Sequence, residues 1–121
     1  MNTRKVEREA WNTYFNSLSN VLHDRPRTVT VELLSETRGD ELVAEHAQLR
    51  AIMWEPKGSE RGDIDIELGN DATGERLVHH VDCADTVWVE EDDAGTPVAI
   101  DIEGRTEEAR EPIKAIIRFE D

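Results

Sequence analysis

The stretch DTVWVEEDDAGTPVAIDIE, residues 85–103, decides the fold that we expect for this chain. Its first part alternates in character, with Val87 and Val89 on the face opposite Trp88. Successive side chains of a β-strand point to opposite faces of a sheet, so the alternation predicts a strand with one buried face. Residues 92–96 carry the Asp and Gly of a turn, and PVAIDIE behind them predicts a second strand. A connection this short joins antiparallel neighbours, because parallel pairing needs a crossover of about a dozen residues or more.

The period of two recurs through most of the chain after residue 27. Residues 41–54 form the longest such segment, and its length predicts a bend or a split near Gln48. Residues 75–83 fit either a strand or a short helix. In DIDIEL, Asp63 and Asp65 alternate with isoleucines and are expected on a solvated face. About seven strands are therefore expected within residues 27–119, namely 27–34, 41–54, 63–68, 75–83, 85–91, 97–103 and 113–119.

The N-terminal segment has a helical period instead. Its apolar residues recur at intervals of three and four, which draws one stripe along a helix of residues 6–23. Asn2 or Thr3 would cap its start, and Arg25 before Pro26 would end it, since a residue before proline avoids the helical region. The expected fold is therefore α+β: a single domain, residues 1–121, with this helix packed on a twisted, mostly antiparallel sheet or barrel-like meander.

Acidic residues outnumber basic ones, with 28 Asp and Glu against 14 Lys and Arg and a formal charge of −14 over 121 residues. A carboxylate-covered surface stays hydrated and dispersed where salt screens charge. We interpret the composition as that of a protein from the cytoplasm of a salt-accumulating halophile. The negative field argues against nucleic acid as a partner, because phosphate binding needs a basic footprint.

Cysteine and hydropathy give the expected compartment. Cys83 is the sole cysteine, so no internal disulfide can form, which is typical of an intracellular protein. The N-terminus lacks the apolar run of a signal peptide, and no stretch approaches the roughly 18 apolar residues of a membrane span. We therefore predict a soluble cytoplasmic protein with no membrane partner.

Two tryptophans are candidates for an interaction surface. Trp88 alternates with Val87 and Val89, and Trp54 alternates with Met53. If the valine and methionine faces form the core, both indoles lie either under the helix or on an exposed patch. An exposed pair would mark a site for a protein partner or for a second copy of the chain.

His79, His80, Asp82 and Cys83 bring zinc-ligand residue types together. Zinc needs three or four ligands that converge on one point, but alternate strand residues point to opposite faces and leave two on each. We therefore predict no metal and no cofactor, and the absence of nucleophile and phosphate-loop motifs predicts no catalytic residue. The same four residues are the candidates for a pocket if the chain binds or hydrolyses a small molecule.

Two Arg-Gly-Asp tripeptides occur, at residues 38–40 and 61–63. Glycine beside aspartate is ordinary turn chemistry, and both tripeptides stand where the strand pattern expects a turn. We interpret them as turns and not as adhesion motifs.

Several segments together resemble an uncharacterised family of short prokaryotic proteins, grouped as a domain of unknown function. The segments are REAWNTYF at residues 8–15, the turn Trp54-Glu55-Pro56, the histidine-bearing residues 77–81 and VWVEED at residues 87–92. The resemblance implies a self-contained domain and carries no catalytic residues with it.

Two functions remain open. The first is a non-catalytic module that binds a protein partner or its own copy through a sheet face or strand edge around Trp54 and Trp88. The second is a small ligand-binding or hydrolytic domain that uses His79, His80, Asp82 or Cys83. A pocket that holds His80 and a carboxylate would favour the second, and a flat apolar patch with a tryptophan would favour the first.

Overall fold

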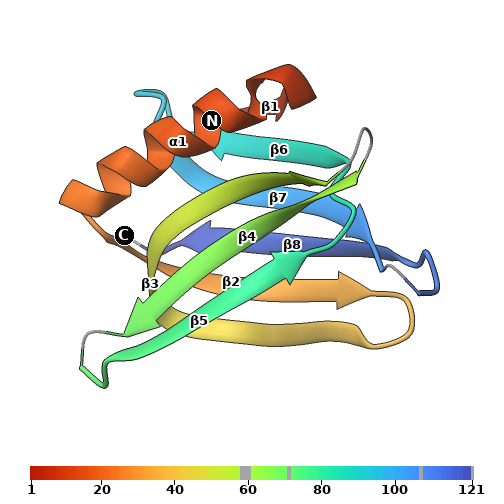
Figure 1. Ribbon diagram of the computed structural model, residues 1–121. Helices are drawn as coiled ribbons and strands as arrows, with labels where there is room; N and C mark the ends of the chain where they lie inside the picture. Colours follow the sequence, from red (N-terminus) through yellow and green to blue (C-terminus); the bar gives the residue numbers. More distant parts are fainter. Residues whose placement is uncertain (58–60, 71, 107, 121) are drawn as a thin grey trace.

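The computed structural model describes residues 1–57, 61–70, 72–106 and 108–120. Within these ranges the chain forms one helix and eight strands (Figure 1). Strand makes up 63% and helix 15%. The prediction of an α+β fold is therefore wrong, and the protein is a sheet-rich fold with a single helix in the described ranges. The elements are β1 (Asn2–Val6), α1 (Arg8–Asp24), β2 (Arg27–Ser35), β3 (Gly39–Lys57), β4 (Arg61–Asn70), β5 (Glu75–Val81), β6 (Thr86–Glu91), β7 (Pro97–Arg105) and β8 (Pro112–Phe119).

All eight strands belong to one open sheet, in the order β1-β6-β7-β8-β2-β3-β4-β5, and all neighbours are antiparallel. Seven of them, β2 to β8, lie within the predicted residues 27–119. The eighth, β1, is the strand that the helical period concealed: it pairs with β6 from Asn2 opposite Glu91 to Val6 opposite Val87. The buried side chain of Val6 fits a strand as well as it fits the apolar stripe of a helix.

The helix consequently begins at Arg8, and neither Asn2 nor Thr3 caps it. Glu7 occupies the N-cap position without a side-chain hydrogen bond to the helix. The helix ends at Asp24, and Arg25 is its C-cap before Pro26, where the sequence predicts the end. In the described part of the chain, the helical segment is too short and too polar to span a bilayer.

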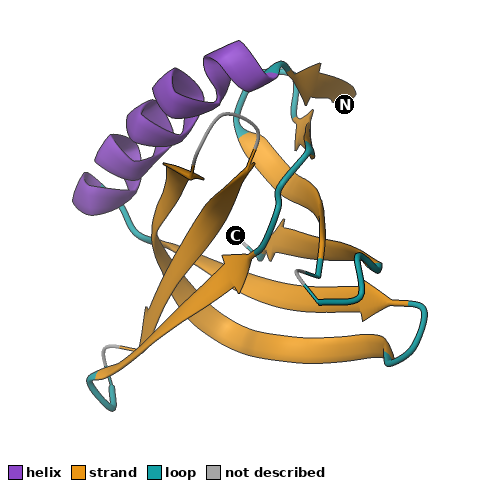
Figure 2. Ribbon diagram, turned by 45° about the vertical axis from the view of Figure 1, so that its right-hand side comes forward, coloured by secondary structure: helices purple, strands orange, loops and turns teal. Residues whose placement is uncertain are grey.

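β3 is 19 residues long and bends in its middle, as predicted for the region of Gln48. His46 has a φ of 52°, and the pairing with β4 shifts register between Leu49 and Ala51. The first half of β3 pairs with β2 up to Leu49, and the second half pairs with β4. The bend turns β4 and β5 so that they run diagonally across β8 and β2, and the sheet is therefore rolled (Figures 1 and 2).

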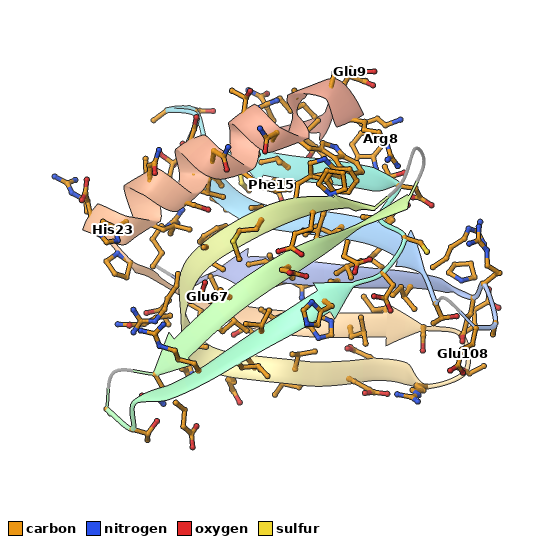
Figure 3. The ribbon with its side chains drawn as sticks, viewed as in Figure 1. Arg8, Glu9, Phe15, His23, Glu67 and Glu108 are labelled. Atoms are coloured by element: carbon orange, nitrogen blue, oxygen red, sulfur yellow. The ribbon has the colours of Figure 1, made fainter. Side chains whose placement is uncertain are left out.

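β2 pairs with β3 only as far as Leu49, and α1 covers the edge of β3 beyond that residue. The hydroxyl of Ser19 accepts a hydrogen bond from the backbone N–H of Ile52 at 3.0 Å and donates one to its carbonyl at 3.1 Å. The indole N–H of Trp11 donates to the carbonyl of Val6 at 2.8 Å, which ties the helix to β1. The buried face of α1 consists of Trp11, Phe15, Leu18 and Leu22, and Figure 3 shows Phe15 on the side of the helix that faces the strands.

The inside of the roll is the core. It is built from alternate residues of β2, β3, β4, β6, β7 and β8 together with α1, including Val29, Val31, Leu49, Ile52, Ile64, Ile66, Val87, Val89, Ile100, Ile102 and Ile117. The end strand β5 reaches the far wall of the roll near its C-terminal end, where the backbone N–H of Arg105 donates to the carbonyl of Asp82 at 3.1 Å. Gly104 permits this contact, because a Cβ there would lie 2.4 Å from that carbonyl oxygen.

Candidate functional site

A cleft of about 460 Å³ opens where β5 approaches the opposite wall of the roll. Three segments supply its polar walls: the end of β5, the turn between β2 and β3, and the connection between β7 and β8. Leu33 and Ile113 supply an apolar part of the wall. We call this the β5 cleft, and its polar side chains are those of Ser35, Thr37, Arg38, His79, His80, Asp82, Thr106, Glu108 and Glu111. Figure 3 shows Glu108 beside the β2–β3 turn, although the two are about 70 residues apart in the sequence.

His79 points to the inner face of the sheet. It pairs with Ile66, whose side chain is fully buried, so the imidazole shares the inner face with the core. Its Nε2 atom is buried and has no hydrogen-bond partner among the described residues. Burial lowers the pKa of His79, and the neighbouring His80 lowers it further, so the ring is neutral near pH 7. A buried polar atom without a partner is rare in folded proteins and costs about 1–3 kcal/mol.

His80 lies on the other face of β5 and pairs with Asp65 of β4. The distance between His80 Nδ1 and Asp65 Oδ1 is 2.5 Å, and the carboxylate is almost fully buried. The hydrogen bond to Asp65 raises the pKa of His80, and the charges of Asp65, Asp63 and Asp82 act in the same direction. Two adjacent histidines at the cleft therefore have opposite protonation tendencies.

The expectation that Asp63 and Asp65 lie on a solvated face is wrong. Their exposed fractions are 7% and 5%. β4 lies between β3 and β5, so side chains of both neighbours flank its outer face, and His80 covers Asp65 there.

The turn and the β7–β8 connection hold each other through Thr37 and Glu111. Both the backbone N–H and the hydroxyl of Thr37 donate to Glu111 Oε1 at 2.9 Å. These hydrogen bonds, with the backbone one first in importance, lower the pKa of Glu111 and keep its carboxylate charged. Sequence reasoning missed Thr37, Arg38, Glu108 and Glu111 as cleft residues. The available signal was the Arg-Gly-Asp tripeptide at residues 38–40, which places Arg38 in a turn but gives no sign of what the turn meets.

The two Arg-Gly-Asp tripeptides have different structures. The turn between β2 and β3 consists of residues 36–38, so the first tripeptide begins in a turn with Arg38, and Gly39, with a φ of 70°, starts β3. The second tripeptide lies wholly within β4, with Gly62 opposite Pro56, and is not a turn. Glycine is needed there because a Cβ would lie 2.3 Å from Cη2 of Trp54. The prediction of a turn at residues 61–63 is wrong for this packing reason.

Of the predicted pocket residues, His79, His80 and Asp82 line the β5 cleft, whereas Cys83 does not. The Cys83 backbone has a φ of 48°, and its Sγ lies 4.0 Å from Nη1 of Arg110. Among the described residues, no three His, Cys, Asp or Glu side chains converge as a metal site would require.

The two candidate tryptophans do not form one surface. Trp54 points inward, opposite Ile64, and meets Trp11 of α1 edge to face at 4.9 Å between ring centroids. The guanidinium of Arg8 lies over both indoles, at 4.8 Å from Trp11 and 5.4 Å from Trp54. Trp54 is therefore part of the helix packing.

Trp88 lies on the outer face and is 38% exposed. Its strand neighbours are Lys5 on one side and Asp101 on the other. Burial raises the pKa of Asp101, which approaches Lys114 to 3.5 Å. The surroundings of Trp88 are therefore charged and not a flat apolar patch.

A comparison with known protein families shows to which family the chain belongs. A model described as "Family of unknown function (DUF5335)" matches residues 2–121. The chain belongs to this family. The resemblance to an uncharacterised family, drawn from the sequence, is thereby confirmed. No curated protein matches this DUF5335 member. Among solved structures, the YojF protein of Bacillus subtilis is similar, at 11% identity over 98% of this chain and 94% of that chain, with a TM-score of 0.51. At that identity the likeness concerns the fold alone.

Two hydroxyl groups of the cleft in this DUF5335 member hold the turn between β2 and β3. The hydroxyl of Thr37 donates to Glu111, and the hydroxyl of Ser35 accepts from the backbone N–H of Arg38 at 3.1 Å. Both hydroxyl groups therefore help to hold the turn. What remains for a ligand is the neutral imidazole and the charged walls around it.

Proposed function

We propose that this protein is a small-molecule-binding domain whose site is the β5 cleft. The observation that carries the proposal is the buried Nε2 of His79, for which the described part of the chain offers no hydrogen-bond partner. A polar ligand that reached this atom would supply a hydrogen bond that none of the described protein groups makes. The volume of about 460 Å³ lies within the range of roughly 300–1,000 Å³ that small-molecule sites have.

The charges on the walls of the β5 cleft limit the class of ligand that can bind there. The carboxylates of Asp82, Glu108 and Glu111 line the cleft against the one guanidinium of Arg38 among its described wall residues. A free anion is disfavoured in such a field, so the ligand is uncharged or cationic and presents a hydroxyl or amide group to His79.

The test is recovery of the ligand. The tagged protein is isolated from its own cells at native salt, and small molecules are extracted and identified by mass spectrometry. The wild type is compared with His79→Leu and with His23→Leu, a matched change at an exposed histidine of α1 that lies far from the cleft in Figure 3. A compound recovered from the wild type and His23→Leu, and reduced at least tenfold in His79→Leu, would support the proposal. Recovery of the same compound from all three, or of none from any, would refute it.

A second candidate is a protein-binding module that uses the free edge of β5. Leu77 and Val78 of this end strand are 46% and 42% exposed. End strands are usually protected by charged residues or proline, but none stands between Arg76 and His80. Light scattering after size exclusion at molar KCl tests the case of self-association: a dimer that dissociates in Val78→Lys would favour it, and a monomer at all concentrations would remove it.

The acidic composition supports the setting of either function, the cytoplasm of a cell that accumulates salt. Carboxylates at this density repel one another in dilute buffer and are screened at molar ionic strength.

A further inference from the structure

A second hollow, of about 470 Å³, lies at the other end of β5. Its apolar lining comes from the bend of β3 and from the β4–β5 hairpin, through Val43, Ala44, Ala47, Leu68 and Leu77. We call it the Leu77 hollow. Its rim is polar and carries charges of both signs on Glu45, Glu75 and Arg76.

The hollow exists because β3 changes partners at its bend. The pairing of β2 with β3 shifts register around Val31, and His46 has a φ of 52°. β3 stays paired with β2 as far as Leu49 and pairs with β4 from Gln48 onward, so the β4–β5 hairpin departs from the direction of β2. The two alanines of β3 are too small to fill the space that this departure opens. The half-exposed Leu77 overhangs it from β5.

The Leu77 hollow and the β5 cleft lie on the same face of one strand. Leu77 pairs with Leu68 and His79 pairs with Ile66, and both partners are buried on the inner face. Two residues of a strand span about 7 Å. An apolar lining and an unpartnered hydrogen-bonding atom therefore stand about 7 Å apart along the inner side of β5.

We infer that the ligand of the β5 cleft is amphipathic: its aliphatic part occupies the Leu77 hollow, and an uncharged hydroxyl or amide head bonds to His79. This rests on the proposed function and adds the class of ligand to it. Binding of the aliphatic part in the hollow is favourable in proportion to the apolar area that it withdraws from water. An uncharged head suits a neutral imidazole, because a carboxylate would have to give up its hydration at a buried atom that carries no charge.

The probe is 1-octanol, whose chain is long enough to cover the interval between the two features. It is titrated into the isotope-labelled protein at molar KCl, and NMR follows the methyl groups of Leu68 and Leu77 and the imidazole nitrogens of His79. Saturable shifts of both groups with one common dissociation constant are expected. Octanoate, with the same chain and a charged head, is expected to bind at least tenfold more weakly.

Two variants and a control locate the binding. Leu77→Ser removes an apolar wall at a half-exposed position, and His79→Leu removes the head-group contact. Each is expected to weaken 1-octanol about tenfold or more. Leu42→Ser is the control, because Leu42 is 57% exposed and pairs with Glu32 on the outer face, outside the hollow; it is expected to change nothing.

The outcomes separate this inference from the proposed function. Methyl shifts that saturate without any response of the His79 ring, or binding unaffected by Leu77→Ser, would overturn the amphipathic ligand. So would the absence of saturable shifts. In each of those cases the recovery experiment with His79→Leu still decides whether the β5 cleft binds a polar molecule of another class.

Discussion

The glycine of the second Arg-Gly-Asp tripeptide gives the sharpest test of the packing. A Cβ on Gly62 would lie 2.3 Å and 2.5 Å from Cη2 and Cζ3 of Trp54, and 2.9 Å from the backbone oxygen of Glu55. The ring cannot retreat freely, because Trp54 meets Trp11 edge to face and lies under the guanidinium of Arg8. Gly62→Ala must therefore displace the indole, the strand pairing of β3 with β4, or both.

The expected loss of stability follows from the nature of the clash. Added methyl groups in a packed interior cost about 1–3 kcal/mol, and the contact with backbone as well as ring places Gly62→Ala at about 2–3 kcal/mol. Gly39→Ala provides the comparison at the other tripeptide. There the penalty of about 1–2 kcal/mol comes from a φ of 70° alone, since a Cβ would meet nothing within 4 Å.

Urea unfolding at molar KCl measures both changes, and a double-mutant cycle with Trp54→Leu separates their causes. Removing the indole should relieve Gly62→Ala and give a coupling of about 1 kcal/mol or more, whereas Gly39→Ala should add to Trp54→Leu without coupling. Near-ultraviolet circular dichroism should change in Gly62→Ala, because the Trp11–Trp54 pair is disturbed, and not in Gly39→Ala. A Gly62→Ala protein that loses less than about 0.5 kcal/mol, or loses equally in both backgrounds, would refute the assignment of this glycine to the packing of Trp54.

Three further predictions follow from the helix, the histidine pair and the surface. Ser19→Ala should cost about 1–3 kcal/mol in urea unfolding, because it leaves the N–H and carbonyl of Ile52 without their hydrogen bonds; a loss below 0.5 kcal/mol would contradict this. The raised pKa of His80 means that its contact with Asp65 stabilises the fold fully below a pH of about 6.5 and less as pH rises through the folded-state pKa. In His80→Gln the melting temperature should therefore depend less on pH in that window than it does in the wild type. An unchanged pH dependence would count against the contact. The melting temperature of the wild type should rise between dilute buffer and molar KCl, and an equal value in both would remove the halophile interpretation.

Alternation predicted most of the sheet because burial on one face imposes it. The strands β2 to β8 other than β5 fall where the sequence repeats every two residues, and the bend of β3 falls near the predicted Gln48. Residues 75–83 fitted a strand or a short helix, and the structure forms a strand, β5, there. β1 escaped because four of its five residues are exposed and Val6 alone is buried, so no period of two develops. Its strand form comes from pairing with the free edge of β6, which is a tertiary effect.

The candidate site was predictable by residue type but not by arrangement. His79, His80 and Asp82 stood out as potential ligands, and a single strand end brings them to the cleft. Thr37 and Glu111 are 74 residues apart, and only the roll of the sheet joins them. The burial of Trp54 could not be predicted, because alternation separates the two faces of a strand but does not show which face α1 will cover.

The bend of β3 links the helix to the candidate site. Where β3 turns away from β2, its backbone loses a strand partner on one side, and α1 replaces that partner through Ser19. On the inner side the same departure leaves the space between the β3 alanines and Leu77. A straight β3 paired with β2 throughout would need no helix at this edge and would leave no hollow under β5. The single helix and the hollow are therefore two consequences of one irregularity, and substitutions that straighten β3 near His46 should affect both.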